Sequence, residues 1–383
     1  MKRYNDRNKG NGSTTVRVVC AVIFLLFSFC WLYWFQAGVM AVAQHVLSGG
    51  MTHYDRLVGA VIITLVLQLV QIVVYAMTRL SGRTHALTYL PSLLTLALFS
   101  SYDVSTGFGW SLWAWLLPLV LVVWGVVVWA SRRVLPFENR HQSNGFFSQC
   151  MWLNLLQMVV MMVGVALLSN THAVFHYKAH AETALEHGNT AEALRVGSRS
   201  SETDESLTML RLFALSLNER IGDSLFCYPI KGTSRDMLPL SGSKSRLLLL
   251  PDSILWQHFG RRPDSLMTVR QYLDSLETDS MATPAFRDYR LAGYLIDRQL
   301  DSFFAMLPRY YTSLSPDSLP IHYREALILF QHQRDTLLFN DSLTLLRWHH
   351  FLQYDSIYPT PHERQIRMEP QDTHTYWFYY FYR

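Results

Sequence analysis

Long apolar runs alternate with short polar segments over the first 170 residues of the chain. The clearest run, Met151–Leu168, carries no formal charge and is close to the ~20 apolar residues that cross a bilayer as a helix. With the runs before it, the pattern predicts a transmembrane domain over residues 16–170 with five spans, at about 18–42, 57–77, 86–102, 110–130 and 147–168. The third span is the weakest, because it is short and contains Pro91, which leaves one helical carbonyl without a partner.

The chain begins with a polar segment rich in Gly, Asn and Ser, and residues 1–15 are predicted to be a disordered cytoplasmic tail. The first apolar run could instead belong to a signal peptide, since Ala41-Val42-Ala43 resembles a cleavage site. A signal peptide has an apolar region of only ~7–15 residues. The run here is much longer, so we expect a retained membrane anchor.

Residues 171–383 carry apolar positions at helical spacing and predict a soluble helical domain. A first helix is expected from His172 to Gly188, where glycine ends it, and Asn189 then caps a short helix over 190–200. A third helix is expected over 204–221, with Gly222 as its stop. The predicted fold class is therefore all-α: a bundle of five transmembrane helices followed by a soluble α-helical domain.

Small residues suggest that some of these helices pair closely. Tyr177–Leu194 resembles one tetratricopeptide (TPR) unit, in which two antiparallel helices meet across a Gly-Asn turn. A second unit is expected at Tyr289–Tyr311, and a third begins near Tyr323. The pattern favours a TPR-like α-solenoid. No strict 34-residue period is present, so a plain helical bundle is the alternative.

Charge divides the chain in the same place. Residues 1–170 carry a net charge of +7 and residues 171–383 a net charge of −3, so the basic excess gives no reason to expect nucleic acid as a partner. With five spans, ten Lys/Arg residues flank one side of the membrane and only Arg56 flanks the other. By the positive-inside rule, the N-terminus is cytoplasmic and the C-terminal domain lies on the opposite side.

Polar residues inside the spans are few, and no Asp, Glu, Lys or Arg lies mid-span. Ionisable groups there would be typical of transporters and proton pumps. Two pairs of amides are one helical turn apart: Gln68 with Gln71, and Asn154 with Gln157. We interpret them as interhelical hydrogen bonds, with a polar substrate path as the alternative.

Four histidines form a narrow stripe on the first soluble helix. His172, His176, His180 and His187 fall within about 80° of one another on a helical wheel, away from its apolar face. Histidines four residues apart can share a metal ion, and a histidine cluster can also sense pH. The alternative is an ordinary polar helix face.

The C-terminus is almost entirely aromatic. It contains Tyr376, Trp377, Phe378, Tyr379, Tyr380 and Phe381. These residues either pack as a last helix on the domain or form an interaction strip for a partner or membrane surface. The sequence contains no GxSxG elbow, P-loop or HExxH motif, so we predict no catalytic residues and no cofactor.

Three stretches carry a resemblance to a known group: Ala43–Ser48 with Thr52–Tyr54, Asp223–Pro229, and Tyr376–Tyr380. Together they resemble an uncharacterised family of multi-spanning membrane proteins from Gram-negative bacteria. The resemblance implies a location in the inner membrane with a TPR-like periplasmic half. It brings no catalytic residues.

The favoured function is a membrane-anchored scaffold or adaptor. Its partners would be the lipid bilayer and a protein or peptide bound by the soluble helical domain, because stacked helix pairs build concave surfaces. Two alternatives stay open: a transporter or channel subunit, and a membrane-surface enzyme acting on lipid or glycan. Their respective signatures would be a polar cavity among the spans and a cluster of carboxylates or histidines in a cleft.

Overall fold

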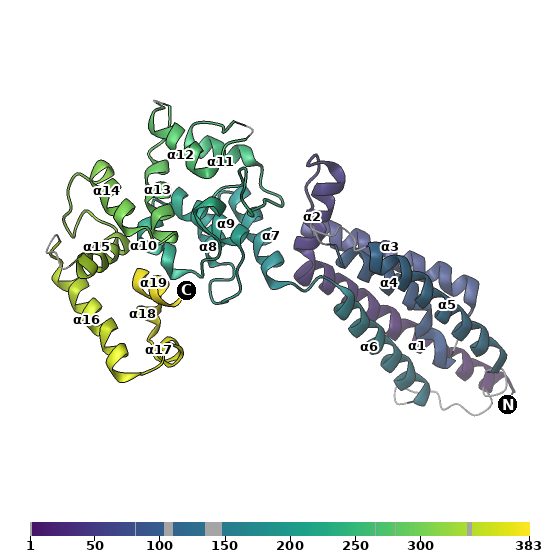
Figure 1. The fold of residues 1–383 in the computed structure, drawn as a ribbon. Helices are drawn as coiled ribbons and strands as arrows, with labels where there is room; N and C mark the ends of the chain where they lie inside the picture. Colours follow the sequence, from purple (N-terminus) through teal and green to yellow (C-terminus); the bar gives the residue numbers. More distant parts are fainter. Residues whose placement is uncertain are drawn as a thin grey trace. The chain divides into compact units, whose positions relative to one another are not determined.

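The computed structural model describes residues 2–80, 82–102, 110–134, 148–264, 266–279, 281–334 and 339–383. Within these residues all the regular secondary structure is helical, with no strand (Figure 1). The predicted all-α class is therefore confirmed. The chain divides into two compact units, Met1–His172 and Ala173–Arg383, here called the N-terminal and C-terminal units.

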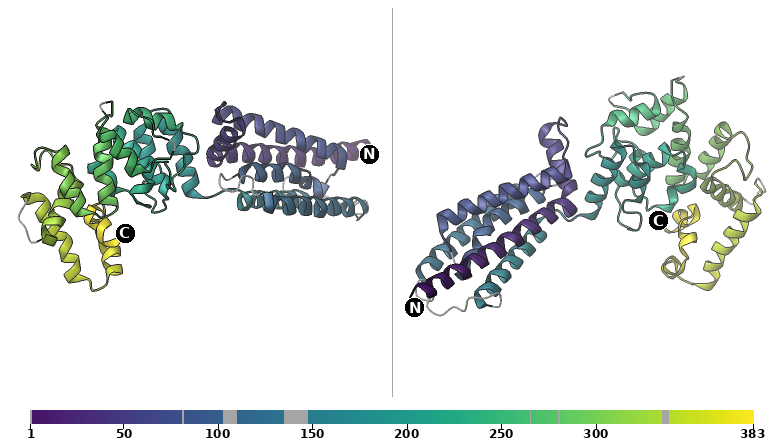
Figure 2. Two further views of the ribbon diagram at one scale, coloured as in Figure 1. Left: turned by 45° about the horizontal axis from the view of Figure 1, so that its top comes forward. Right: turned by 180° about the vertical axis from the view of Figure 1, so that it is seen from behind.

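The N-terminal unit is a bundle of long apolar helices that run side by side (Figures 1 and 2). Its elements are α1 (Lys2–Cys30), η1 (Trp31–Phe35), α2 (Ala37–Ser48), α3 (Arg56–Thr78), η2 (Gly82–Tyr89), α4 (Leu90–Ser100), α5 (Trp110–Val134) and α6 (Gln149–Leu168). Among the described residues, four segments are long and apolar enough to cross a membrane: Thr14–Phe35, Arg56–Thr78, Leu112–Arg133 and Gln149–Leu168. This chain is therefore a membrane protein.

Two predicted boundaries at the N-terminus differ from the structure. Helix α1 begins at Lys2, so it includes most of the residues expected to be a disordered tail; extending an existing helix avoids the cost of nucleation. The first span was expected to continue to residue 42. It ends at Phe35, because Gln36 leaves the helix and its buried amide donates to the carbonyl of Asn170 at 3.3 Å.

The expected third span, 86–102, is not one α-helix. Residues Gly82–Tyr89 form the 3-10 helix η2, and α4 begins at Leu90 with Pro91 in its first turn, where proline needs no helical donor. The two segments follow each other directly and pack against α3 and α6. The count of five spans therefore stays a prediction.

Polar residues of the spans hold this short segment in place. Asn154 on α6 accepts from the Ala86 N–H at 2.8 Å and donates to the Gly82 carbonyl at 2.8 Å. Gln71 on α3 donates to the Thr88 hydroxyl at 3.0 Å. These contacts match the interpretation of the amides as interhelical hydrogen bonds.

The C-terminal unit consists of short helices around one apolar core. Its elements are α7 (Ala173–Glu186), α8 (Thr190–Arg195), α9 (Glu205–Leu217), α10 (Ile221–Ser224), η4 (Leu225–Cys227), η5 (Ser234–Asp236), α11 (Asp252–Phe259), α12 (Val269–Glu277), α13 (Ala285–Ile296), α14 (Leu300–Tyr310), α15 (Ile321–Arg334), α16 (Ser342–Ile357), α17 (Pro361–Arg367), α18 (Pro370–Thr373) and α19 (Tyr376–Tyr382). The three expected helix pairs are present as α7–α8, α13–α14 and α15–α16, whose members pack together.

Three of the helix hairpins, α7–α8, α9–α10 and α13–α14, close with the same turn. One residue in each turn takes a left-handed conformation: Gly188 (φ 72°), Glu219 (φ 55°) and Arg298 (φ 58°). The next residue then donates its N–H five residues back, in the bonds Asn189→Ala184 at 2.8 Å, Arg220→Leu215 at 2.9 Å and Gln299→Tyr294 at 2.8 Å. This Schellman closure satisfies carbonyls at the helix end.

The closure also corrects a predicted boundary. Gly222 was expected to end the third soluble helix, but α9 ends at Leu217 and the turn uses Glu219. Gly222 lies inside α10, where a Cβ atom would come within 2.6 Å of Pro320. It therefore serves a close approach between α10 and the start of α15.

A buried carboxylate anchors the irregular segment before α11. Glu182 on α7 is fully buried, and its Oε2 accepts the N–H groups of Leu248, Leu249 and Leu250 at 2.8, 2.6 and 2.8 Å. Burial raises the pKa of Glu182, while the three amide donors act in the opposite direction. The Glu182 carboxylate thus accepts the hydrogen bonds of three successive backbone N–H groups, which in a helix or strand would go to backbone carbonyls.

Candidate functional site

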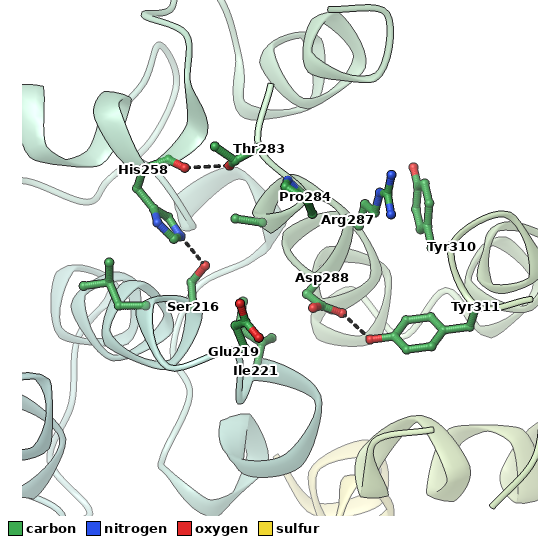
Figure 3. Close-up of a pocket in the computed structure, with 12 residues that line it drawn as sticks. Ser216, Glu219, Ile221, His258, Thr283, Pro284, Arg287, Asp288, Tyr310 and Tyr311 are labelled. Atoms are coloured by element: carbon green, nitrogen blue, oxygen red, sulfur yellow. Dashed lines mark hydrogen bonds between the residues drawn. The ribbon is translucent and has the colours of Figure 1, made fainter. Parts of the chain in front are cut away.

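A cavity of about 460 Å³ opens within the C-terminal unit and is called here the acidic cleft (Figure 3). It lies between the end of α9, the end of α11, the start of α13 and the end of α14. It is lined by Ser216, Leu217, Glu219, Ile221, His258, Thr283, Pro284, Ala285, Arg287, Asp288, Tyr310 and Tyr311. Polar and ionisable side chains make up most of this lining, unlike the core beneath it.

Asp288 is the largely buried carboxylate of the cleft. Its Oδ1 accepts from the hydroxyl groups of Tyr311 at 2.9 Å and Tyr323 at 2.8 Å. Burial raises its pKa; the two hydroxyl donors oppose this rise, and the nearby carboxylates Asp223 and Glu219 add to it. The two tyrosines therefore fix the carboxyl group in one orientation and leave its other oxygen toward the cavity (Figure 3).

The mouth of the cleft carries opposite charges. Glu219 is exposed at the left-handed turn after α9. Arg287, also exposed, places its guanidinium 6.0 Å from the centre of the Tyr310 ring. The lining therefore contains two carboxylates and one cation, and that cation lies over an aromatic face.

A serine–histidine pair lies on the opposite wall (Figure 3). The Ser216 hydroxyl and His258 Nε2 are 2.7 Å apart, and the Thr283 hydroxyl donates to the His258 carbonyl at 2.6 Å. Burial lowers the pKa of His258, so its ring is neutral at pH 7. Rings of Phe213 and Phe259 pack edge-on against it at 5.6 and 5.5 Å.

A second cavity of about 320 Å³ lies on the other side of α13. Its lining includes Arg290, Gly293 and Tyr294 from that helix and Asp297, which follows the helix directly. Gly293 packs on the η5 segment, where a Cβ atom would be in ordinary contact, at 3.4 Å, with Met237 and Ser234. Helix α13 therefore separates the two cavities, with Asp288 facing the acidic cleft.

The four histidines of the predicted stripe have different surroundings in the structure. Among the described residues, no three His, Cys, Asp or Glu side chains are grouped to hold a metal ion. His180 Nε2 lies 2.9 Å from Glu192 Oε1, and His187 Nδ1 lies 2.7 Å from the Thr183 carbonyl. His176 packs edge-on to Phe175 at 5.9 Å, and His172 precedes α7.

The aromatic C-terminus is mainly part of the core. Tyr376 and Trp377 are 0% exposed, and Phe378 and Tyr379 are also buried. Of the six residues predicted as an interaction strip, Tyr380 is half-buried and Phe381 is 51% exposed. The packing alternative therefore holds for the first four residues.

Sequence reasoning missed the acidic cleft. One signal was available: Asp288 falls on the same helical stripe as Leu291, Ala292 and Leu295, which are fully buried. An acidic residue within an apolar stripe marks either a paired core carboxylate or a site. His258 and Ser216 had no such signal, because their pairing joins residues 42 positions apart.

Residues 256–383 match a family of unknown function (DUF6057). The matched region covers about a third of the chain and includes His258, Asp288 and Tyr311 of the cleft. The comparison with curated proteins found no match, and the comparison with solved structures found none either. The expected resemblance to a family without known function is confirmed for this region.

Proposed function

We propose that this protein is a membrane-anchored scaffold or adaptor whose C-terminal unit binds a segment of a partner protein or peptide in the acidic cleft. The observation that carries the proposal is the pre-formed cavity with Asp288 held by two tyrosine hydroxyls. Binding sites are concave and contain a few fixed polar groups. TPR-like stacking of the helix hairpins would place this cleft on a concave face.

The charges of the cleft favour a basic group on the ligand. Asp288 and Glu219 supply negative charge, and Asp223 lies near enough to raise the pKa of Asp288 further. The one lining cation, Arg287, lies over the Tyr310 ring. A lysine or arginine side chain would relieve the repulsion among the carboxylates and place its apolar stem against Tyr311.

Site-specific photocrosslinking in native membranes tests this proposal. A photoreactive amino acid replaces Leu217, which lines the cleft and is 38% exposed, and in a second protein replaces Ile366, which is 66% exposed outside it. We expect a discrete adduct only from position 217, and its loss in the Glu219→Gln and Asp288→Asn variants. Identical adducts from both positions would exclude the cleft as the binding site. An adduct that persists in the Glu219→Gln and Asp288→Asn variants would exclude it too.

We further propose that the C-terminal unit lies in the periplasm of a bacterial inner-membrane protein, which requires η2 and α4 to cross the bilayer as the third of five spans. Eight 3-10 residues at ~2.0 Å each and eleven α-helical residues at ~1.5 Å each extend about 32 Å. A bilayer core is ~30 Å thick. This length and the ten-to-one distribution of Lys/Arg support the crossing.

Cysteine labelling in intact cells with a permeabilised outer membrane tests the orientation. Leu266, which is 82% exposed in the C-terminal unit, and Arg133, at the end of α5, are replaced by cysteine in separate Cys227→Ser proteins. With five spans, a membrane-impermeant maleimide labels the first protein and spares the second. With four spans, the reagent labels the Arg133→Cys protein and spares the Leu266→Cys protein. That result would contradict the periplasmic location of the C-terminal unit.

A second candidate function is a hydrolase, because Ser216 and His258 line the cleft as a hydrogen-bonded pair. A neutral histidine in contact with a serine hydroxyl is the arrangement that activates a nucleophile. A fluorophosphonate probe should then label the purified full chain at Ser216, and Ser216→Ala should abolish the label. An unlabelled parent protein would remove this candidate.

A further inference from the structure

A second group of reactive side chains lies away from the acidic cleft, where η4 meets the first turn of α15. It consists of Cys227, His322 and Glu325, called here the thiol site. His322 is 2% exposed and Glu325 is 0% exposed. The His322 Nδ1 atom lies 2.9 Å from Glu325 Oε2, which also accepts the Tyr376 N–H at 2.7 Å.

The Cys227 thiol lies beside the C-terminal segment, where it donates to the carbonyl of His374 at 4.0 Å. Among the described residues, His322 Nε2 has no hydrogen-bond partner that meets normal geometry, although it is buried. The Cys227 thiol interacts with this ring and raises its pKa. Phe226 brings the two together, because its own ring packs edge-on against His322 with centroids 5.1 Å apart.

The charges around the site favour a protonated His322. Burial by itself lowers its pKa. Glu325 and Cys227 raise the pKa by more than burial lowers it, so that the pKa is about 9. Glu325 lies 4.0 Å from Arg347 on α16. On the C-terminal side, His374 has a pKa lowered by burial, by Arg383 and by His322. The pKa of Tyr228, next to Cys227, is raised by burial and by that thiol.

Cys227 differs from the other three cysteines of the chain. Cys20, Cys30 and Cys150 belong to the apolar helices of the N-terminal unit, and two of them are buried. Cys227 is partly exposed, and it is the only cysteine in residues 173–383. It therefore has no neighbouring thiol within its own unit.

We propose that Cys227 is a site of thiol–disulfide exchange with small-molecule disulfides. Its proton passes to water, and the thiolate is held beside the His322 imidazolium, an arrangement that favours the reactive form of a cysteine. The thiolate attacks one sulfur of R–S–S–R, the S–S bond breaks, and Cys227–S–S–R forms. The second sulfur leaves as a thiolate and takes a proton from water.

The rate of reaction with 4,4′-dithiodipyridine tests the proposal on the full chain in detergent. The reference is Leu266→Cys in a Cys227→Ser background, because that position is 82% exposed and far in sequence from any part of the thiol site. At pH 6 we expect Cys227 to react at least about tenfold faster than this exposed thiol, with a shallower rise of rate toward pH 9.

Two further variants separate the role of His322 from a general effect on the fold. His322→Gln should slow the reaction at pH 6 by about tenfold while the far-ultraviolet circular dichroism stays that of the parent. Arg334→Ala, at the far end of α15 with its side chain 58% exposed, serves as a folded control and should leave the rate within about twofold of the parent. A Cys227 rate at or below that of the exposed reference, or one unchanged in folded His322→Gln, would overturn the assignment.

Discussion

Trp377 offers the clearest test of how the aromatic C-terminus is used. The side chain is 0% exposed, its Nε1 donates to the Glu325 carbonyl at 2.8 Å, and its ring lies 5.0 Å from Trp348 and 5.9 Å from Phe351. Phe381 belongs to the same helix, α19, but is 51% exposed. The pair therefore compares a packed and an exposed member of one predicted strip.

The expected losses of folding free energy differ several-fold between the Trp377→Ala and Phe381→Ala variants. Trp377→Ala removes a fully buried aromatic side chain, at a cost of about 3–5 kcal/mol, and leaves the Glu325 carbonyl without its donor, at about 1 kcal/mol more. Phe381→Ala should cost about 1 kcal/mol, because only part of its ring leaves water on folding. For a unit of this size, 1 kcal/mol corresponds to ~2–4 °C in the melting temperature.

Thermal unfolding of the purified full chain, followed by circular dichroism in detergent, measures both variants. We expect the transition of the C-terminal unit to fall by about 10–20 °C for Trp377→Ala and by less than about 5 °C for Phe381→Ala. Equal falls in melting temperature for the two variants would refute the description of this helix as core. A Trp377→Ala protein that melts at the temperature of the parent would refute it too. Loss of partner binding in Phe381→Ala alone would instead show that its exposed end has an interaction role.

Three further predictions use the same thermal assay. Gly222→Ala should destabilise the C-terminal unit by about 1–3 kcal/mol, because the new methyl group would lie 2.6 Å from Pro320; an unchanged transition would contradict that close approach. Glu182→Ala leaves three buried amides without an acceptor, at about 1–3 kcal/mol each, whereas the exposed Glu202→Ala should have no effect. Burial by itself lowers the pKa of His322, but Glu325 and Cys227 outweigh burial and raise the pKa from the ordinary 6.5 to about 9. Its stabilising contribution, about 3 kcal/mol, is therefore complete below pH 6.5 and lost as the pH rises to 9; a transition that does not fall in this range, or falls equally in His322→Gln, would contradict the ion pair.

Membrane helices were the most predictable part of the fold, because their signal is composition over a long window. The run Met151–Leu168 falls within α6, Gln149–Leu168. Prediction failed where one polar contact decides the backbone. Gln36 ends the first span through a bond to a residue 134 positions away, and no local pattern contains that information.

The helix hairpins show the same limit at a smaller scale. Gly188 was predicted to end its helix, because glycine takes the left-handed conformation without strain. Glu219 and Arg298 make the same turn with side chains that disfavour it. Their sequences give no warning, and the apolar packing of the helices on either side selects the turn.

The acidic cleft could not be predicted from local motifs, because it is assembled from four separate segments. Asp288 alone was detectable, as an acidic residue on an apolar stripe. Its two partners, Tyr311 and Tyr323, come from the end of α14 and the start of α15. The orientation of the carboxyl group is a property of tertiary structure, and its pKa follows from that orientation.

The first turn of α15 serves both sites at once. Tyr323 donates to Asp288 in the acidic cleft, whereas its neighbour His322 contacts Glu325 and interacts with Cys227. Glu325, one turn later, holds His322 and the start of α19. Consecutive helical positions are about 100° apart, so one turn can support two sites without sharing a side chain. A His322 variant that slows the thiol reaction must therefore be checked for crosslinking at Leu217. A change in both assays would indicate a displaced α15, and a change in the thiol reaction alone would assign the effect to the imidazolium.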